Sequence, residues 1–274
     1  MSASSPGTVR VALPMRIMGV VNVTPDSFSD GGDFIDPAAA VSQALTHEAE
    51  GADMIDIGGE STRPGHQPVG ADEEWRRVAP VLQGLAGRLT VPVSIDTWRA
   101  DTAVRAVGLG ARIVNDVWGF QADPAMAAVV ARHGVDAILM HNRREIDGSL
   151  DIIEDMKRFF DRSLALARAA GVEPGRITLD PGIGFGKSFE QNLDCIRRLP
   201  ELKALGFPVL IGASRKSFLQ RFLAHQTVPK QRLSGTLGAH AAAVALGADI
   251  IRVHDVAAHR EMLSVYALLR GLAP

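Results

Sequence analysis

The chain alternates between short apolar runs and longer stretches in which apolar residues recur every three or four positions. The apolar runs are four to eight residues long and rich in β-branched side chains. This alternation is typical of βα units around a parallel sheet that is buried on both faces. The predicted strands cover residues 16–23, 54–58, 91–96, 113–117, 137–141, 177–180, 209–213 and 250–254.

Capping residues mark the ends of the helices. Asp36 and Asp123 each precede a proline, a pairing that supplies an N-cap and a first helical residue, and Gly51 and Gly134 end helices. The predicted helices cover residues 37–50, 71–85, 100–109, 124–133, 150–170, 189–198, a split pair at 216–223 and 234–246, and 257–272. Eight such units without a large insertion predict an α/β fold, a (β/α)8 TIM barrel that forms a single domain. We expect a flexible tail at residues 1–12 and the barrel at 13–274.

Composition and charge narrow the choice of partner. The chain has 274 residues, of which 46% are hydrophobic and 22% charged, as in globular enzymes and unlike disordered chains. A net charge of -2 without a dense Lys/Arg cluster gives no reason to expect nucleic acid or an anionic membrane. We therefore expect small-molecule partners.

Targeting signals and cysteine usage indicate the compartment. No apolar run reaches about 18 residues, so we expect no membrane span, and the first ten residues lack the apolar segment of a signal peptide. Cys195 is the only cysteine and cannot form an intramolecular disulfide. We interpret it as a buried or half-buried helical thiol in a reducing compartment, and the predicted location is the cytoplasm.

A polar loop follows the first predicted strand. From Asn22 onward the sequence NVTPDSFSDGG crowds turn-forming and hydrogen-bonding residues around one aromatic, Phe28. An ordinary turn needs fewer residues and no phenyl ring, which favours a functional loop.

Polar residues also lie at the ends of nearly all the predicted strands, where barrels of this kind carry their reacting groups. Burying an unpaired charge costs several kcal/mol, so these groups must be paired or bind a ligand. They are Asn22, Glu60, Ser61, Thr62, Arg63, Asp96, Asn115, Asp116, His141, Asp180, Ser214, Arg215, Lys216, Arg252 and His254.

One group of these residues suits a flat ring. Two carboxylates, an amide and an ammonium could read the edge of a planar heterocycle that carries both N–H and C=O groups; they belong to Asp96, Asn115, Asp180 and Lys216. The alternative is that either aspartate alone is a helix N-cap or a salt-bridge partner.

A second group suits an anion. Residues two apart on a strand face the same side, so Arg252 and His254 should point into one space, with Asn22 also directed at an anionic ligand. The predicted helix start just after Ser214 would add an anion site. The alternative is that Arg252 and His254 form a core ion pair with Asp255.

Seven ordered motifs together resemble one family. They are NVTPDSFSDGG, GGESTRPG, SIDT, VNDV, DPGIGFGK, GASRKSFL and RVHDV, and they run from Arg16 to Val256. This series is similar to that of the dihydropteroate synthases, pterin-binding enzymes of folate synthesis and targets of sulfonamides. The sequences at Trp118 and His141 differ from those that are more common in the family. The fold of this family is the (β/α)8 barrel, in agreement with the pattern of units.

The resemblance implies an activity, a cofactor and a set of site residues. The reaction joins (7,8-dihydropterin-6-yl)methyl diphosphate to 4-aminobenzoate and gives 7,8-dihydropteroate and diphosphate. Mg²⁺ is the implied cofactor, with Asn22 as its contact, and the implied assembly is a homodimer. The implied binding residues are Asp96, Asn115, Asp180 and Lys216 for the pterin; Thr62, Arg63, Arg252 and His254 for the diphosphate; and Phe28, Pro64, Phe185, Lys216 and Ser217 for the aminobenzoate.

The substrates suggest a mechanism. An aromatic amine is a neutral nucleophile, so no dedicated base is needed, and catalysis must help the diphosphate leave. We expect a dissociative substitution in which a cationic methylene group is stabilised by Asp96 and Asp180. Two other functions stay open: a catalytically silent pterin-binding paralogue, and a pterin-binding methyltransferase domain that presents methyl-folate to a corrinoid partner.

Overall fold

Eight parallel strands form the centre of the computed structural model, which describes residues 15–24, 36–61, 69–223 and 228–272. Their order is β6-β5-β4-β3-β2-β1-β8-β7. The bounds are β1 (Arg16–Asn22), β2 (Met54–Gly58), β3 (Val93–Asp96), β4 (Ile113–Asp116), β5 (Asp136–Met140), β6 (Ile177–Asp180), β7 (Leu210–Ile211) and β8 (Ile250–Val253). The predicted strands are all present, and the expected tail at residues 1–12 lies outside the described residues.

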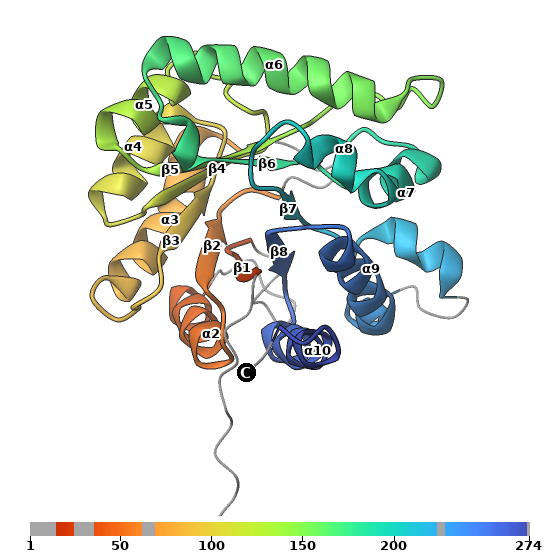
Figure 1. The fold of residues 1–274 in the computed structure, drawn as a ribbon. Coiled ribbons are helices and arrows are strands. Elements are labelled where there is room, and N and C mark those ends of the chain that lie inside the picture. Colours follow the sequence, from red (N-terminus) through yellow and green to blue (C-terminus); the bar gives the residue numbers. More distant parts are fainter. Residues whose placement is uncertain (1–14, 25–35, 62–68, 224–227, 273–274) are drawn as a thin grey trace, which may run out of the picture.

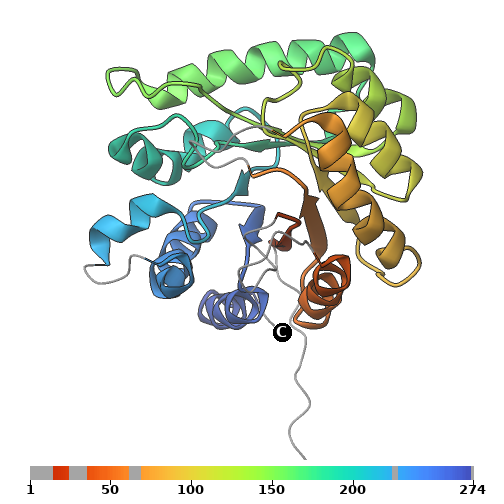
Figure 2. The same ribbon diagram turned by 180° about the vertical axis from the view of Figure 1, so that it is seen from behind.

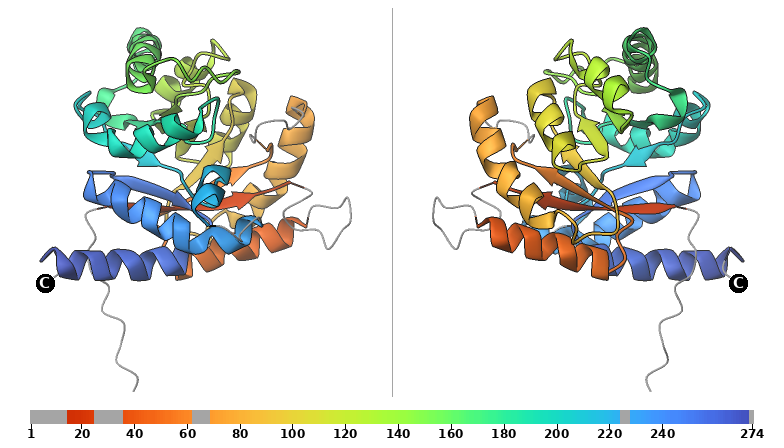
Figure 3. Two further views of the ribbon diagram at one scale, coloured as in Figure 1. Left: turned by 90° about the vertical axis from the view of Figure 1, so that its right-hand side faces the viewer. Right: turned by 90° about the vertical axis from the view of Figure 1, so that its left-hand side faces the viewer.

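Helices surround the strands on all sides (Figure 1), and the view from behind shows the same ring (Figure 2). They are α2 (Pro37–Ala49), α3 (Ala71–Leu85), α4 (Ala100–Gly108), α5 (Met126–His133), α6 (Ile152–Ala170), α7 (Phe189–Arg197), α8 (Leu199–Lys203), α9 (Leu233–Ala245) and α10 (Val256–Leu269), with the 3-10 turns η1 (Pro174–Arg176), η2 (Ser217–Phe222) and η3 (Pro229–Arg232). The side views show α2 and α10 lying along β1 (Figure 3). This arrangement confirms the predicted (β/α)8 barrel.

The barrel closes between β6 and β7. A single parallel bridge joins Leu179 to Val209, and the Leu179 amide donates to the carbonyl of Pro208 at 2.9 Å. By contrast, β1 and β2 share a register of five residue pairs. The seam between β6 and β7 is therefore the weakest part of the ladder.

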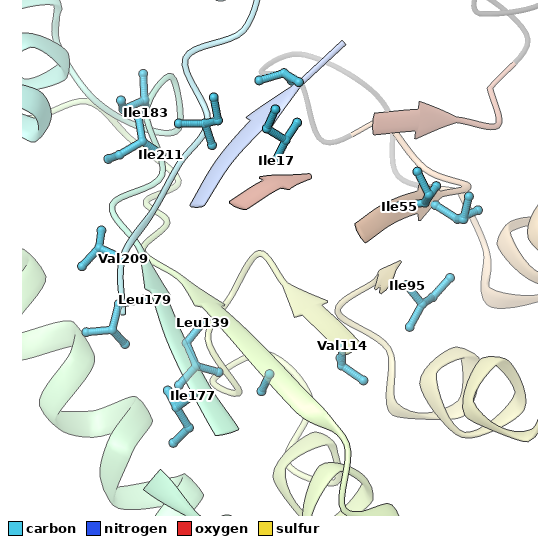
Figure 4. Packing of buried hydrophobic residues seen from close by; sticks show 14 of the residues in the cluster. Ile17, Ile55, Ile95, Val114, Leu139, Ile177, Leu179, Ile183, Val209 and Ile211 are labelled. Atoms are coloured by element: carbon cyan, nitrogen blue, oxygen red, sulfur yellow. The ribbon is translucent and has the colours of Figure 1, made fainter. Parts of the chain in front are cut away.

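The outward side chains of the strands make the main core. Residues such as Ile55, Ile95 and Leu139 are fully buried and lie between the strands and the surrounding helices (Figure 4). These positions alternate with positions that face the barrel axis, as the two-residue period of a strand requires. The core thus fixes every strand from outside and leaves its inner face free for other chemistry.

An inner apolar layer fills the barrel below the strand ends. It consists of Met18, Met54, Ile113, Ile138, Leu210 and Ile250. On three of these strands a polar group follows two residues further along, on the same side: Asp56 after Met54, Asn115 after Ile113 and Arg252 after Ile250. The apolar layer is therefore a floor beneath a polar chamber.

Two predicted helix starts are wrong. Asp123 does not cap α5, whose N-cap is Ala125; its carboxylate instead accepts from the amides of Ala100, at the start of α4, and Ala125. The predicted helix at 216–223 is the 3-10 turn η2. It therefore supplies no α-helical N-terminus after Ser214. Among the described residues, no helix is long and apolar enough to span a membrane.

Candidate active site

The ends of neighbouring strands bring the predicted ring-binding residues together. Asp96 lies opposite Gly58 on one side and Asn115 on the other, in the registers of β2, β3 and β4. A Cβ atom at Gly58 would lie 3.3 Å from the Cβ of Asp96. Glycine at position 58 therefore leaves room for the Asp96 side chain.

The four predicted pterin residues line one pocket, together with Arg252. We call it the ring pocket. Its polar lining consists of Asp96, Asn115, Asp180, Lys216 and Arg252, and its other walls are Val117, Met140, Gly182, Ile183, Phe185 and Gly212. Polar groups thus converge on one pocket with apolar walls, a combination typical of small-molecule sites.

Arg252 donates to two carboxylates at this pocket, one of which also accepts from Asn115. Its Nε donates to Asp56 Oδ2 at 2.7 Å and its Nη2 to Asp96 Oδ2 at 2.8 Å. Asp56 Oδ2 also accepts from Asn115 Nδ2 at 3.0 Å. Asp56 is fully buried. The two aspartates therefore hold the guanidinium in place, and two of its five N–H groups are used.

Asp56 was not among the predicted site residues. Its sequence signal is a carboxylate in the middle of the apolar strand MIDIG, two residues after inward-facing Met54. The predicted site residues lie at the strand ends, whereas Asp56 lies one inner layer deeper. The inward position of a charged residue within an apolar strand is the signal that marks it.

Several buried oxygens around the pocket lack a partner. Among the described residues, Oδ1 of Asp56, Asp96 and Asn115 and Oγ of Ser94 have no hydrogen bond. A buried polar atom without a partner is costly. The acceptors at Asp96 and Asn115, which line the pocket, therefore fit a ligand that supplies N–H donors.

The loop after β6 forms the wall beside Lys216. Asp180 Oδ1 accepts from the Gly182 amide at 2.7 Å, and the Lys216 ammonium lies 4.2 Å from the centre of the Phe185 ring. At Gly184, with φ of +87°, a Cβ atom would approach Lys216 Cδ to 3.1 Å. The glycines of this loop thus let the backbone pass close to the lysine.

Lys187 stabilises this loop from below. Its buried ammonium donates to the carbonyls of Gly182 at 2.9 Å, Phe185 at 3.0 Å and His141 at 3.3 Å. Burial lowers the pKa of Lys187 to about 8. A cation with three carbonyl acceptors holds a glycine-rich segment that would otherwise have few contacts.

Burial shifts the ionisation of the pocket groups. It raises the pKa of Asp96 to about 7, although the Arg252 charge opposes the shift, and it raises the pKa of Asp180. Burial, followed by the Arg252 charge, lowers the pKa of Lys216 to about 7. Burial also acts to lower the pKa of Arg252, but the Asp56 and Asp96 charges outweigh it and keep that pKa above its usual value. Perturbed groups of this kind cluster at functional sites.

His254, one of the predicted anion-binding residues, is held by Ser214, and its neighbour Asp255 is paired elsewhere. His254 Nδ1 lies 2.9 Å from Ser214 Oγ, and its backbone amide donates to the same hydroxyl at 3.2 Å. Asp255 pairs with Arg215 through two hydrogen bonds. The alternative ion pair of Asp255 with Arg252 or His254 is therefore wrong, because Arg215 occupies that carboxylate.

Other predicted residues lie at the rim or outside the described part of the chain. Thr62, Arg63, Phe28 and Pro64 lie outside the described residues, and Ser217 begins η2 directly after Lys216. Trp118 and His141, where the motifs vary, line a wider cleft that shares Val117 and Phe185 with the ring pocket.

Asn22 is the predicted metal contact. Its carboxamide is half-buried at the end of β1, and among the described residues none hydrogen-bonds to it. An amide oxygen is a hard ligand that suits Mg²⁺, an ion that commonly keeps several waters and is held by substrate phosphates. The residue fits the implied ion, although the described residues contain no cluster of three His, Cys, Asp or Glu side chains that could hold a metal.

Known proteins resemble this chain over nearly its full length. Residues 18–254 match the profile of the pterin binding enzyme family. The dihydropteroate synthase of Synechocystis sp. is 48% identical over 255 residues, which cover 91% of this chain and 88% of that protein. The dihydropteroate synthase of Clostridium difficile, solved in the presence of pteroic acid, has a TM-score of 0.88 and 47% identity, over 93% of this chain and 96% of that chain. The Xanthomonas albilineans enzyme in complex with 7,8-dihydropteroate has a TM-score of 0.85 and 39% identity, over 96% of this chain and 97% of that chain.

The family profile extends from β1 to the end of β8 and includes all the residues of the ring pocket, so the barrel is of the pterin-binding class. Identities of 39–48% over at least 88% of each partner are far above those at which only a fold is shared. The chain belongs to the dihydropteroate synthase family.

Proposed function

We propose that this chain joins (7,8-dihydropterin-6-yl)methyl diphosphate to 4-aminobenzoate, forming 7,8-dihydropteroate and diphosphate, and so acts as a transferase of folate synthesis. The observation that carries the proposal is the ring pocket, which is lined by all four residues predicted to bind a pterin edge. Family membership supports the same reaction.

The pocket chemistry matches the pterin edge. Buried Oδ1 atoms of Asp96 and Asn115 lack partners and would accept from ring N–H and amino groups. Lys216 supplies the donor for a ring carbonyl or nitrogen. A neutral ring with alternating donors and acceptors satisfies both sets at once, whereas a purely apolar ligand would leave the oxygens unpaired.

The diphosphate would lie above the pterin, toward the end of β8. Arg252 keeps N–H groups that Asp56 and Asp96 do not use, and His254 is oriented by the Ser214 hydroxyl. Asn22 would hold Mg²⁺ through its amide oxygen. When bound, that ion supplies positive charge that stabilises the departing diphosphate.

The aminobenzoate would lie beside Phe185 and Lys216, where the ring and the ammonium already make a 4.2 Å contact. Ser217 follows directly along the chain. Phe28 and Pro64 belong to the same proposed subsite. A ring that stacks near the Lys216 cation would place its amino group toward the pterin methylene.

The proposed chemistry is a dissociative substitution. As the C–O bond breaks, the electron pair leaves with the diphosphate and the methylene becomes cationic, conjugated with the pterin. The Asp96 and Asp180 carboxylates face this pocket and would stabilise that charge. The amine then attacks through its lone pair and releases a proton.

A direct assay tests the function. The purified protein should form dihydropteroate and release diphosphate when given pterin diphosphate, 4-aminobenzoate and Mg²⁺. Pterin binding without diphosphate release would instead establish the silent paralogue, and methyl transfer from a methylated pterin to a corrinoid would establish the methyltransferase domain.

A separate experiment tests the mechanism. Positional isotope exchange in the diphosphate without net turnover supports the dissociative path; its absence, with concerted kinetics, contradicts it.

We also propose that the protein is a cytoplasmic homodimer. Cys195 is fully buried in α7, where burial raises the pKa of its thiol to about 12 and so disfavours the reactive thiolate, in keeping with a structural thiol. On α9, a Cβ atom at Gly235 would lie 2.7 Å from Leu223 of the same chain, whereas one at Gly238 would meet nothing within 4 Å. Gly235 therefore packs within its own barrel, and Gly238 leaves room for close packing against a second copy. Sedimentation analysis measures the oligomeric state.

A further inference from the structure

Two histidines outside the ring pocket are linked by a continuous chain of hydrogen bonds. His240 on α9 and His259 on α10 are both fully buried, and their ring centres lie 4.9 Å apart. His240 Nε2 accepts from the Ala213 amide at 3.0 Å, His240 Nδ1 lies 2.9 Å from His259 Nε2, and His259 Nδ1 lies 2.6 Å from the Asp255 carbonyl. We call these two side chains with their two backbone partners the histidine bridge.

The ends of the bridge determine the direction of all three bonds. A backbone amide only donates, so His240 Nε2 carries no proton and Nδ1 carries it. His240 Nδ1–H then donates to His259 Nε2, which leaves the proton of His259 on Nδ1. That N–H donates to a carbonyl, which only accepts. Both rings must therefore be neutral and in the same tautomer.

A further proton on either ring would break the bridge, because two donors would then face each other at about the length of one bond. Burial lowers the pKa of His240 well below its usual value, and burial also lowers the pKa of His259. The charged or titratable groups that face the pair are His254, and Asp255 with its partner Arg215. The three hydrogen bonds of the bridge consequently keep the same donors and acceptors across the physiological pH range.

The bridge fastens the segment from Ala213 to Lys216 to the end of β8. The same segment contains Arg215, whose φ of +58° is uncommon for a residue with a side chain. Its amide donates to Thr236 Oγ1 at 3.1 Å and its carbonyl accepts from Arg232 at 2.7 Å. Such a conformation persists only where the surroundings hold it.

The proposed pterin contact Lys216 and the proposed diphosphate contact His254 both depend on this segment. Ser214, one residue after the bridged amide, hydrogen-bonds to His254, and Lys216 reaches into the ring pocket. We propose that His240 and His259 are positioning residues that set Lys216 and the Ser214–His254 pair for the reaction, although neither lines the ring pocket. This inference rests on the proposed function.

A double-mutant cycle tests it. His240→Leu leaves the Ala213 amide without a partner and should lower kcat/KM for pterin diphosphate about tenfold or more. In a Lys216→Met background the same change should cost less than about threefold, since contacting or coupled residues are not additive. His240→Gln, which restores an acceptor and a donor, should recover part of the loss.

His47→Leu is the matched control. His47 is also buried and its Nε2 lies 3.2 Å from a backbone carbonyl, that of Val20, away from the Ala213–Lys216 segment. Its loss should lower the melting temperature without a dependence on Lys216. Equal costs of His240→Leu in both backgrounds, or unchanged kcat/KM in that variant and in His240→Gln, would overturn the inference.

A second readout does not depend on activity. Nitrogen-15 NMR of the wild-type protein should show both rings neutral, with the proton on Nδ1, between about pH 6 and 8. An Nε2–H tautomer or a titration in that range in either ring contradicts the bridge. If the wild-type protein forms no dihydropteroate, the proposed function fails, and calorimetry of pterin binding to His240→Leu and wild type still decides the inference.

Discussion

At the scale of single residues, the site consists of buried charges that solvent does not satisfy. Asp96 and Lys216 both have pKa values of about 7, reached from opposite directions because burial disfavours a charge of either sign. Because the two charges also interact, Asp96 and Lys216 titrate as a coupled cluster, with macroscopic pKa values that belong to the set.

The pH profile of kcat/KM for pterin diphosphate should therefore be bell-shaped around neutrality. The acid limb reflects protonation of Asp96, which removes the stabilising carboxylate, and the alkaline limb reflects loss of the Lys216 proton, which removes a donor. Lys216→Arg keeps the charge at high pH, so it should abolish the alkaline limb even if the rate falls. Lys203→Arg, at a surface pair with Asp249, should leave the profile unchanged. An alkaline limb retained in Lys216→Arg would contradict the assignment.

Asp56→Ala should be among the most damaging changes that leave the pocket lining intact. It removes the acceptor of both Arg252 and Asn115 and leaves a buried cation with one partner. Breaking a buried pair in this way costs about 3–5 kcal/mol of unfolding free energy. Asp101→Ala removes the partner of Arg105 at the surface, which should cost no more than about 1 kcal/mol. Denaturant unfolding measures both, and equal losses would show that Asp56 is not a key partner.

At the scale of secondary structure, the strands were easier to predict than their connections. All eight strands follow from apolar runs, because the outward residues must pack against helices and the inward ones against each other. The 3-10 turn η2 follows Arg215, whose left-handed conformation is held by long-range contacts with Thr236 and Arg232. Such long-range contacts leave no periodic trace in sequence.

The pocket residues divide in the same way. Asp96, Asn115, Asp180 and Lys216 were predictable, since a polar group at the end of a buried barrel strand must be paired or bind a ligand. The Arg252 contacts with Asp56 were not, because they join residues 196 positions apart. Ion pairs across the barrel form between inward-facing side chains at the same height along the axis. That height depends on the register of the strands, which the sequence does not state.

The loop after β6 gives a prediction at this scale. Gly182 and Gly171 have φ of +66° and +86°, so alanine is strained at both. A Cβ atom at Gly182 would lie 2.0 Å from the His141 carbonyl oxygen, whereas one at Gly171 meets nothing within 4 Å. Gly171→Ala should cost about 1 kcal/mol, and Gly182→Ala should cost more and weaken pterin binding at least tenfold. Thermal unfolding and calorimetry measure the difference, and similar behaviour of the two variants would refute the collision argument.

At the scale of the whole molecule, the barrel brings together at one end groups that a smaller scaffold could not bury. Eight helices or helix pairs around the strands exclude water from the carboxylates, and the apolar floor isolates the ring pocket from the opposite end. The ladder is least complete between β6 and β7, where β7 has two residues. Residues on both sides of this seam, Asp180 and Lys216, line the ring pocket.

A ligand that contacts both sides should therefore tighten the seam. In the free protein the amide of Leu179, which donates across the seam, should exchange with solvent faster than the amide of Ile55, which donates to Pro92 in the continuous part of the ladder. Saturation with pterin diphosphate should slow exchange at Leu179 more than at Ile55, because binding to Asp180 and Lys216 couples the two strands. In Lys216→Met this selective protection should decrease, since the ligand then loses its charged contact on the β7 side of the seam. Equal slowing at both amides in the wild-type protein would mean that the ligand stabilises the barrel as a whole and that the seam does not respond to the site.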